Sequence, residues 1–267
     1  MSELSANQRH YLKTLKRQKQ WVIFARILLF AAFFLLWEIS ARLGWIDSFI
    51  FSSPSRVTAV LVKMAADGSL FLHIGVTLAE TLFSFFLVVL LGLGIAVLLW
   101  LSPRLSLVLE PYLVVLNSLP KSALAPLLIV WLGANMNTIV VAGISVAIFG
   151  AILNLYTGFM EVSPEKIKLI YTLHGTKRDA LFKVVLPGTI PNIISNMKVS
   201  IGLCLIGVII GEFISSRQGL GYLIIYGSQV FQLDLVIMSI LILCMIAAAL
   251  YAIITLAEKF YTCTFFH

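Results

Sequence analysis

The chain has 267 residues, of which 60% are hydrophobic and only 12% are charged, and its mean hydropathy is +1.03. A soluble domain is about 45–50% apolar and about 25% charged, so in water this chain would expose far more apolar surface than a soluble monomer tolerates. An ordinary soluble enzyme is therefore excluded. At about 20 residues per crossing, the chain has room for roughly five to seven membrane spans.

The charge balance is 19 Lys and Arg against 12 Asp and Glu, a net charge of +7. In a polytopic membrane protein the excess of basic residues in cytoplasmic segments produces such a balance, so no nucleic-acid partner is expected. Cys204, Cys244 and Cys263 lie in or beside apolar stretches with no metal-ligand spacing. They are interpreted as small hydrophobic residues, and no metal site is predicted.

The first 21 residues are polar and basic and are expected to be a cytoplasmic segment. A long apolar run follows, and no small-residue cleavage site ends it, so it is interpreted as a retained first span over Val22–Gly44. Residues 22–267 are expected to form one transmembrane domain. Five further spans are predicted at Ile74–Leu101, Leu107–Leu132 (interrupted by Pro120 and Pro126), Thr138–Tyr156, Met197–Ile214 and Leu235–Leu256.

These spans predict an all-α polytopic membrane protein with six transmembrane helices and both termini on the same side. With the N-terminus inside, four basic residues fall in outer segments: Arg42, Arg56, Lys63 and Arg217. Fourteen fall in inner segments: Arg9, Lys13, Lys16, Arg17, Lys19, Arg26, Arg104, Lys166, Lys168, Lys177, Arg178, Lys183, Lys198 and Lys259. This asymmetry predicts that both termini are cytoplasmic.

Two outer segments have local structure of their own. Ser53 or Ser55, on either side of Pro54, is expected to cap a short surface helix through Met64, and the turn Asp67-Gly68 is expected to end it. Residues 215–234 are too polar to span and too apolar to lie free in water. They are expected to lie at the outer interface or to pack over the bundle.

The longest inner loop, residues 158–192, predicts two short helices. Ser163 is a good N-cap before Pro164, and Ile167, Ile170 and Tyr171 form one apolar stripe at helical spacing. His174-Gly175 interrupts the pattern, Thr176 and Asp179 form a loose capping box, and Leu186-Pro187 is expected to close the segment. Such a loop either lies on the lipid surface with its lysines against anionic headgroups or docks into a cytoplasmic partner.

The stretch KLIYTLHGTKRDALFKVVLPGTIPNI resembles the cytoplasmic loop of ABC importer permeases, whose pattern is Glu-Ala-Ala, three residues, Gly, nine residues, then Ile-x-Leu-Pro. Aligned on Leu186-Pro187, residues 168–170 stand at the Glu-Ala-Ala positions and His174 at the glycine, with Gly175 next. The segments LLWEISARLGWIDSFIFSSPSRV, LNSLPKSALAPLLIVWLGANMNTIVVAGISVAIFGAILNLYTGF and GEFISSRQGLGYLIIYGSQVFQLDLVIMSILI resemble one subfamily closely: the permease subunits of nitrate, sulfonate and taurine importers.

This resemblance implies a type I ABC importer permease fold and a bacterial cytoplasmic (inner) membrane location. It implies a homodimer, two cytoplasmic ATPase subunits that bind ATP and Mg²⁺, and an extracytoplasmic binding protein that delivers a small anionic solute. Relatives that carry bicarbonate or pyrimidine precursors of thiamine keep other solutes open. The coupling residues carried over are Lys168, Leu169, Ile170, Tyr171, His174, Gly175, Lys177 and Pro187. The chain has no G-x-x-x-x-G-K-[ST] loop, so it is not expected to be an enzyme or to bind a cofactor itself.

Polar residues within spans are the candidates for the translocation path. Asn117 and Lys121 flank the break at Pro120, where Lys121 would either attract an anion or extend to the inner surface. Glu212, before the glycines of the outer loop, would act in a gate or anchor that loop. Glu38 and Glu80 are expected to be partly solvated and have no assigned role. Gly202, Gly207 and Gly211 are expected to allow close helix approach, either at a dimer contact of the fifth span or in packing within the bundle. An ion-coupled secondary transporter and a membrane enzyme remain the competing classes.

Overall fold

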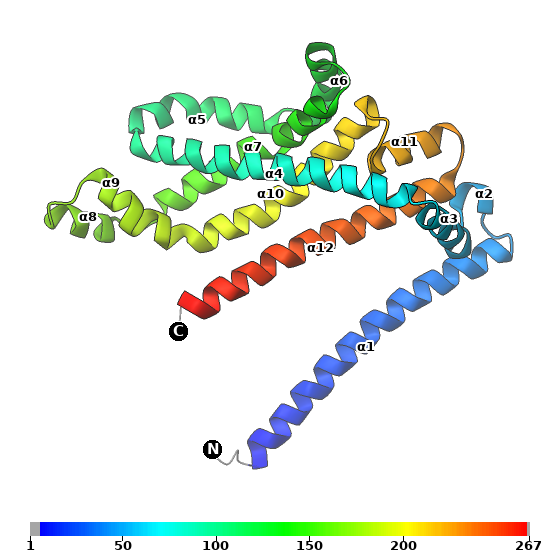
Figure 1. The fold of residues 1–267 in the computed structure, drawn as a ribbon. Coiled ribbons are helices and arrows are strands. Elements are labelled where there is room, and N and C mark those ends of the chain that lie inside the picture. Colours follow the sequence, from blue (N-terminus) through cyan, green and yellow to red (C-terminus); the bar gives the residue numbers. More distant parts are fainter. Residues whose placement is uncertain (1–5, 266–267) are drawn as a thin grey trace. The chain divides into compact units, whose positions relative to one another are not determined.

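The computed structural model describes residues 6–265, and every regular element among them is helical (Figure 1). These residues divide into two compact units, one ending at Lys63 and one beginning at Met64, and each is described by itself. The helices are α1 (Ala6–Arg42), α2 (Ser48–Phe51), α3 (Pro54–Ala66), α4 (Ser69–Leu101), α5 (Pro103–Ser118), α6 (Lys121–Leu132), α7 (Met136–Met160), α8 (Pro164–Thr172), α9 (Lys177–Ala180), a π-helical turn (Leu181–Val185), α10 (Leu186–Ser215), α11 (Leu220–Gln229) and α12 (Leu233–Phe265).

Five stretches are long and apolar enough to cross a membrane: Gln20–Arg42, Ser69–Leu101, Met136–Met160, Lys177–Ser215 and Leu233–Phe260. A sixth apolar stretch consists of α5 and α6, which meet at an angle of 97°. All six predicted spans overlap these stretches, so the all-helical membrane fold is confirmed. The count of six holds if α5 and α6 form one broken span, and the orientation stays a prediction.

The third predicted span breaks at Pro120, and Pro126 does not interrupt it. Leu119 is extended with ψ 140°, as expected for a residue before proline, and α6 begins directly after Pro120. Pro126 lies inside α6 without ending it. The expectation of two interruptions was therefore right at one proline and wrong at the other.

In the first unit, side chains of α1 fix the segment that follows. The Trp37 Nε1–H donates to the Phe51 carbonyl at 3.2 Å. The carboxylate of Glu38 pairs with Arg42 at 2.6 Å and accepts from the Ser55 N–H at 3.1 Å. Ser53 Oγ accepts from the Arg56 N–H at 3.4 Å, which confirms Ser53 as a cap for the predicted surface helix, α3.

The core of the second unit is formed mainly where α4, α7 and α10 pack together, and small residues line their contacts. A Cβ added at Gly207 would lie 2.8 Å from the Ala142 carbonyl oxygen, and one at Gly211 would lie 3.0 Å from Ile139 Cα. A Cβ at Gly202 would meet nothing within 4 Å. Close helix approach within the bundle is therefore confirmed at Gly207 and Gly211, and at Gly202 close approach stays a prediction.

The expectation that Leu186-Pro187 closes the second short helix of the inner loop is wrong. The helical path runs from Lys177 to Ser215 through the π-helical turn. In that turn the Leu186 N–H donates to the Leu181 carbonyl, five residues back. Pro187 lies at the start of α10, where the hydrogen-bonding pattern changes, so its missing N–H costs little there.

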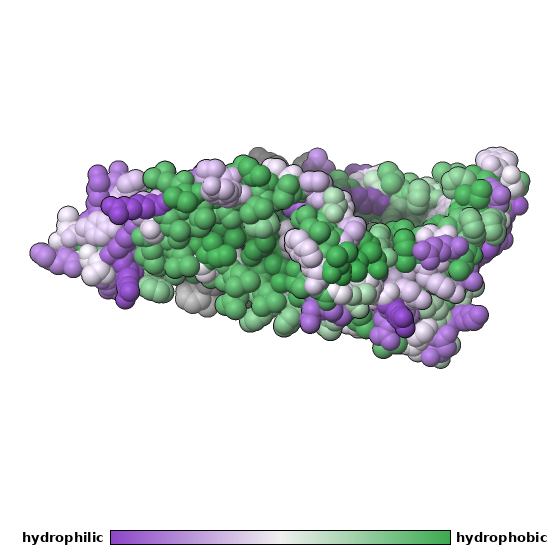
Figure 2. Space-filling model, turned by 90° about the horizontal axis from the view of Figure 1, so that it is seen from above, coloured by the Kyte–Doolittle hydropathy of each residue, from purple (hydrophilic) through white to green (hydrophobic). Residues whose placement is uncertain are grey.

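The second unit has two distinct ends, named here for the residues they hold. The Glu212 end contains the start of α4, the start of α7, the end of α10 and all of α11; the loop end contains the end of α4, the end of α7, α8 and α9. Figure 1 places α8 and α9 at one extremity of this unit and α11 at the other. In Figure 2 hydrophilic residues gather at the extremity that carries α8 and α9, next to a broad apolar band.

Candidate functional site

At the loop end, α8 is fixed to the bundle by one face. Ile167 and Ile170 are half-buried and pack on a cluster that includes Trp100, Phe159 and Val185. The predicted apolar stripe therefore faces the bundle through these two isoleucines, whereas its third member, Tyr171, is 45% exposed.

The other face of α8 is uncovered in the described chain. Leu169 is 59% exposed and Leu173 is 70% exposed, and the exposed Lys166 and Lys168 lie beside them. Apolar side chains held out on a short, fixed helix with a basic rim are typical of a surface that meets another protein. We call these four residues the α8 surface.

The turn after α8 depends on the two residues His174 and Gly175. His174 adopts the left-handed conformation with φ 58°, at the position where the family pattern has glycine. The Gly175 N–H donates to the Ile170 carbonyl at 2.8 Å, and a Cβ on Gly175 would lie 2.4 Å from Ile170 Cγ2. In this loop the left-handed conformation therefore belongs to His174, whereas the position that must lack a side chain is Gly175.

The second helix of the loop begins as its sequence predicts. Thr176 and Asp179 form a complete capping box, in which the Thr176 N–H donates to Asp179 Oδ2 at 2.9 Å. Lys177 donates to the Leu101 carbonyl at 3.0 Å and lies over the Trp100 ring, so its charge is engaged within the chain. Ser163 makes no capping hydrogen bond, and the cap predicted for α8 is wrong in that detail.

At the Glu212 end, a buried carboxylate holds the start of α11. Glu212 is fully buried; it accepts from Thr77 Oγ1 at 2.6 Å, from the Gly221 N–H at 2.5 Å and from the Tyr222 N–H. Thr77 Oγ1 in turn accepts from the Leu220 N–H at 2.8 Å. The free N–H groups at a helix start require acceptors, and a negative charge is favourable there.

His73 and Gly219 complete this anchor. His73 Nδ1 accepts from the Gly219 N–H at 3.0 Å. Gly219 has φ +104°, and a Cβ there would lie 2.3 Å from Glu212 Oε1. These hydrogen bonds are those of a loop anchor, one of the two roles weighed for Glu212, and its place in a translocation path stays a prediction.

Glu80 lies beside this anchor, and the expectation that it is partly solvated is wrong. It is only 2% exposed, and its side chain is within hydrogen-bonding distance of the Glu212 carboxyl. The sequence does contain a signal for this cluster, because His73, Thr77 and Glu80 recur at i, i+4 and i+7 and so share one face of α4.

The other path candidates lie apart from Glu212 in the hydrogen-bond network. The Lys121 ammonium donates to the Asn117 carbonyl across the break between α5 and α6. The Asn117 side chain faces Gly150 of α7, since its Oδ1 lies 3.3 Å from a Cβ built there. Asn117 and Lys121 are thus brought together, whereas Glu212 belongs to the anchor formed by α4, α10 and α11.

A family model described as the binding-protein-dependent transport system inner membrane component matches residues 88–261. The chain belongs to this family. A probable ABC transporter permease protein of Haemophilus influenzae is 33% identical over 225 residues, which cover 84% of this chain and 91% of that protein. The chain is thus a permease subunit of the ABC importer family. The same match shows that it is a component of an inner-membrane transport system.

Named relatives differ in what they transport. A formylaminopyrimidine transport permease of Halalkalibacterium halodurans is 27% identical, covering 73% of this chain and 77% of that protein. The taurine transport permease of Escherichia coli is 24% identical, covering 79% of each chain. A crystal structure of an amino acid ABC transporter with histidines matches the fold with a TM-score of 0.61 and 20% identity, covering 74% of this permease and 97% of that chain.

Proposed function

We propose that this permease forms the translocation path of an ATP-driven importer for a small anionic solute, as a homodimer with both termini cytoplasmic. A separate extracytoplasmic binding protein delivers the solute, and two cytoplasmic ATPase subunits bind and hydrolyse ATP. In this arrangement the loop end faces the cytoplasm and the Glu212 end faces outward, and the helices rock between inward-open and outward-open states.

The observation that carries this proposal is the α8 surface. A nine-residue helix is fixed to the bundle through Ile167 and Ile170 while Leu169 and Leu173 stay exposed. A helix presented in this way can enter a groove of a partner with its apolar side chains and transmit a displacement to the bundle on which it rests. A surface that only met lipid headgroups would not need this rigid support.

The test is co-purification of the ATPase with the full-length permease. Leu169→Glu and Leu173→Glu place a charge in the proposed contact and should abolish co-elution of the ATPase. Val62→Glu, at an apolar position on α3 that is 59% exposed, is the matched control and should leave it intact. If both α8 variants retain the ATPase as well as the control does, the coupling assignment is wrong.

The solute class is supported by the relatives and by Lys121, a half-buried cation at the break between α5 and α6. A pyrimidine precursor of thiamine is the second candidate, favoured by the formylaminopyrimidine relative. Uptake by the reconstituted importer, measured with labelled taurine and with labelled formylaminopyrimidine, separates the two. Uptake that continues without ATP under an ion gradient would instead indicate a secondary transporter.

A further inference from the structure

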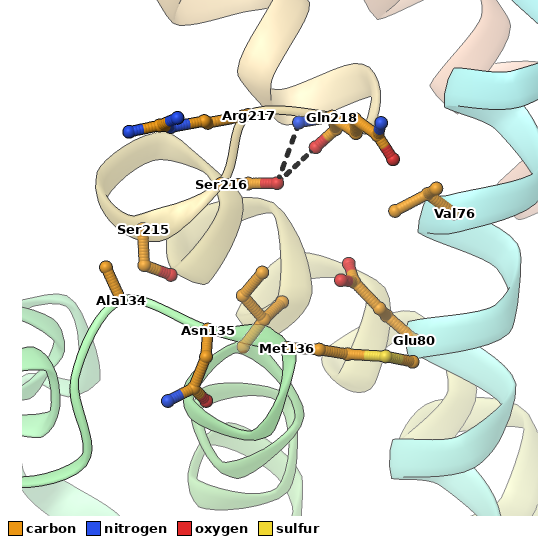
Figure 3. Close-up of a pocket in the computed structure, with 10 residues that line it drawn as sticks. Val76, Glu80, Ala134, Asn135, Met136, Ser215, Ser216, Arg217 and Gln218 are labelled. Atoms are coloured by element: carbon orange, nitrogen blue, oxygen red, sulfur yellow. Dashed lines mark hydrogen bonds between the residues drawn. The ribbon is translucent and has the colours of Figure 1, made fainter.

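A cavity of about 460 Å³ opens at the Glu212 end, between the start of α4, the start of α7 and the loop from α10 to α11. Its volume lies in the range of about 300–1,000 Å³ that small-molecule sites occupy. Figure 3 shows side chains from these three segments around one space, with the Glu80 carboxyl group directed into it from α4.

Most polar side chains around this cavity are already used by the chain itself. Asn135 caps α7 by accepting from the Thr138 N–H at 3.1 Å, and its amide donates to the Leu132 carbonyl at 2.7 Å. Ser215 Oγ donates to the Gly211 carbonyl at 2.9 Å. Ser216 Oγ accepts from the Gln218 N–H at 3.0 Å (Figure 3). These groups shape the wall and leave little hydrogen-bonding capacity for a ligand.

Glu80 is different, because it is almost fully buried and its Oε2 receives no donor from any described residue. Its neighbour Glu212 already accepts three hydrogen bonds, from Thr77, Gly221 and Tyr222. Two acidic side chains are therefore buried next to each other, and the chain supplies donors to Glu212 but not to Glu80 Oε2. In a bilayer a buried acceptor without a donor is costly, and so is any negative charge on such a pair that no cation compensates.

A ligand that resolves both costs brings a positive charge and N–H donors together. A protonated amine does so, with up to three donors on one cation. A bound metal ion fits less well, since hard cations take about six to eight oxygen ligands and the described residues hold no group of three or more potential ligands. Arg217, which also lines the cavity and is exposed, could pair with an acidic group on the same molecule.

We propose that this cavity binds the protonated amino group of the transported solute, with the Glu80 carboxyl as its acceptor. This inference rests on the proposed function and sharpens it: among small anionic solutes it selects those that also carry an amine, such as aminosulfonates. Glu80 then contacts the solute directly, and Glu212 lies beside it and anchors α11.

The test uses the full-length permease in lipid nanodiscs and two probes of equal charge, ethylammonium and tetramethylammonium. Ethylammonium has N–H donors and tetramethylammonium has none. Ethylammonium should raise the unfolding temperature in a saturable way, and tetramethylammonium should not. Equal effects of the two ions, or no effect of ethylammonium, would overturn the proposal without any variant being needed.

Glu80→Gln then locates the effect. The amide keeps the side-chain shape and can donate to Glu212, so the variant should fold with an unfolding temperature at least equal to that of the wild type. Its affinity for ethylammonium should fall about tenfold or more, as expected for loss of a charged acceptor. Glu110→Gln makes the same change at an exposed site on α5 and should bind as the wild type does.

Unchanged affinity in Glu80→Gln would refute the role of Glu80. The binding measurement needs neither the ATPase nor the binding protein, so its failure is distinct from failure of the proposed function. Retention of the ATPase by both α8 variants, together with intact ethylammonium binding, would refute the coupling assignment alone.

Discussion

Gly207→Ala tests the closest contact between α7 and α10. An added Cβ would lie 2.8 Å from the Ala142 carbonyl oxygen and 2.8 Å from Gly143 Cα, both of them backbone atoms. An ordinary contact begins at 3.4 Å, so the helices must separate by about 0.6 Å, the difference between the two distances. Because neither atom can rotate away, the strain falls on the packing of the two helices.

Overpacking of this kind costs about 1–3 kcal/mol. Alanine also gains up to about 1 kcal/mol over glycine as a helix former, and that gain must be removed from the comparison. Gly202→Ala supplies the correction, since it makes the same change in the same helix where a Cβ meets nothing within 4 Å. The difference between the two variants is then the overpacking itself, about 1–3 kcal/mol.

The assay is unfolding of the purified chain in mixed micelles by increasing SDS, followed by circular dichroism. Gly207→Ala should unfold at lower SDS than the wild type, and Gly202→Ala at equal or higher SDS. If the two variants are equally stable, α7 and α10 do not approach as closely as described, and the assignment of Gly207 to their contact is wrong.

Two further substitutions test the two ends of the second unit. Thr77→Val leaves Glu212 without one donor and the Leu220 N–H without an acceptor, and each loss should cost about 1–3 kcal/mol and speed amide exchange at residues 219–222. Thr81→Val removes a buried hydroxyl that has no partner among the described residues, so it should not speed this exchange. Equal exchange in the two variants would contradict the anchor. His174→Gly should stabilise the chain by about 1 kcal/mol, because glycine adopts the left-handed conformation without penalty. The control variant Leu173→Gly should not stabilise it. A His174→Gly variant that is less stable than the wild type would show that the imidazole itself contributes to the turn.

The sequence predicts the local features of this fold well. The helices follow from apolar runs, the break at Pro120 follows from the restriction that proline places on Leu119, and the capping box follows from residues three apart. Each of these depends on neighbours along the chain. The all-helical class and the family resemblance are confirmed because they rest on such local patterns.

What the sequence does not predict depends on distant partners. The burial of Glu80 depends on Glu212, and the link from Thr77 to Glu212 joins residues 135 positions apart. No pattern along the chain predicts that α4 and α10 meet there, and the polar face of α4 indicates only that these residues lie on one side of the helix. The π-helical turn was missed for another reason: its residues, LFKVV, have the same apolar spacing that an α-helix would have.

The continuous helical path from Lys177 to Ser215 has a mechanical consequence. It contains 39 residues, and at about 1.5 Å per residue it measures roughly 58 Å. One end carries the loop proposed to meet the ATPase, and the other carries Glu212, close to the mouth of the cavity. A tilt imposed at α9 would therefore be transmitted along this helical path to the Glu212 end. The path would bend at the π-helical turn and at Pro191, where the regular α-helical hydrogen bonding is interrupted.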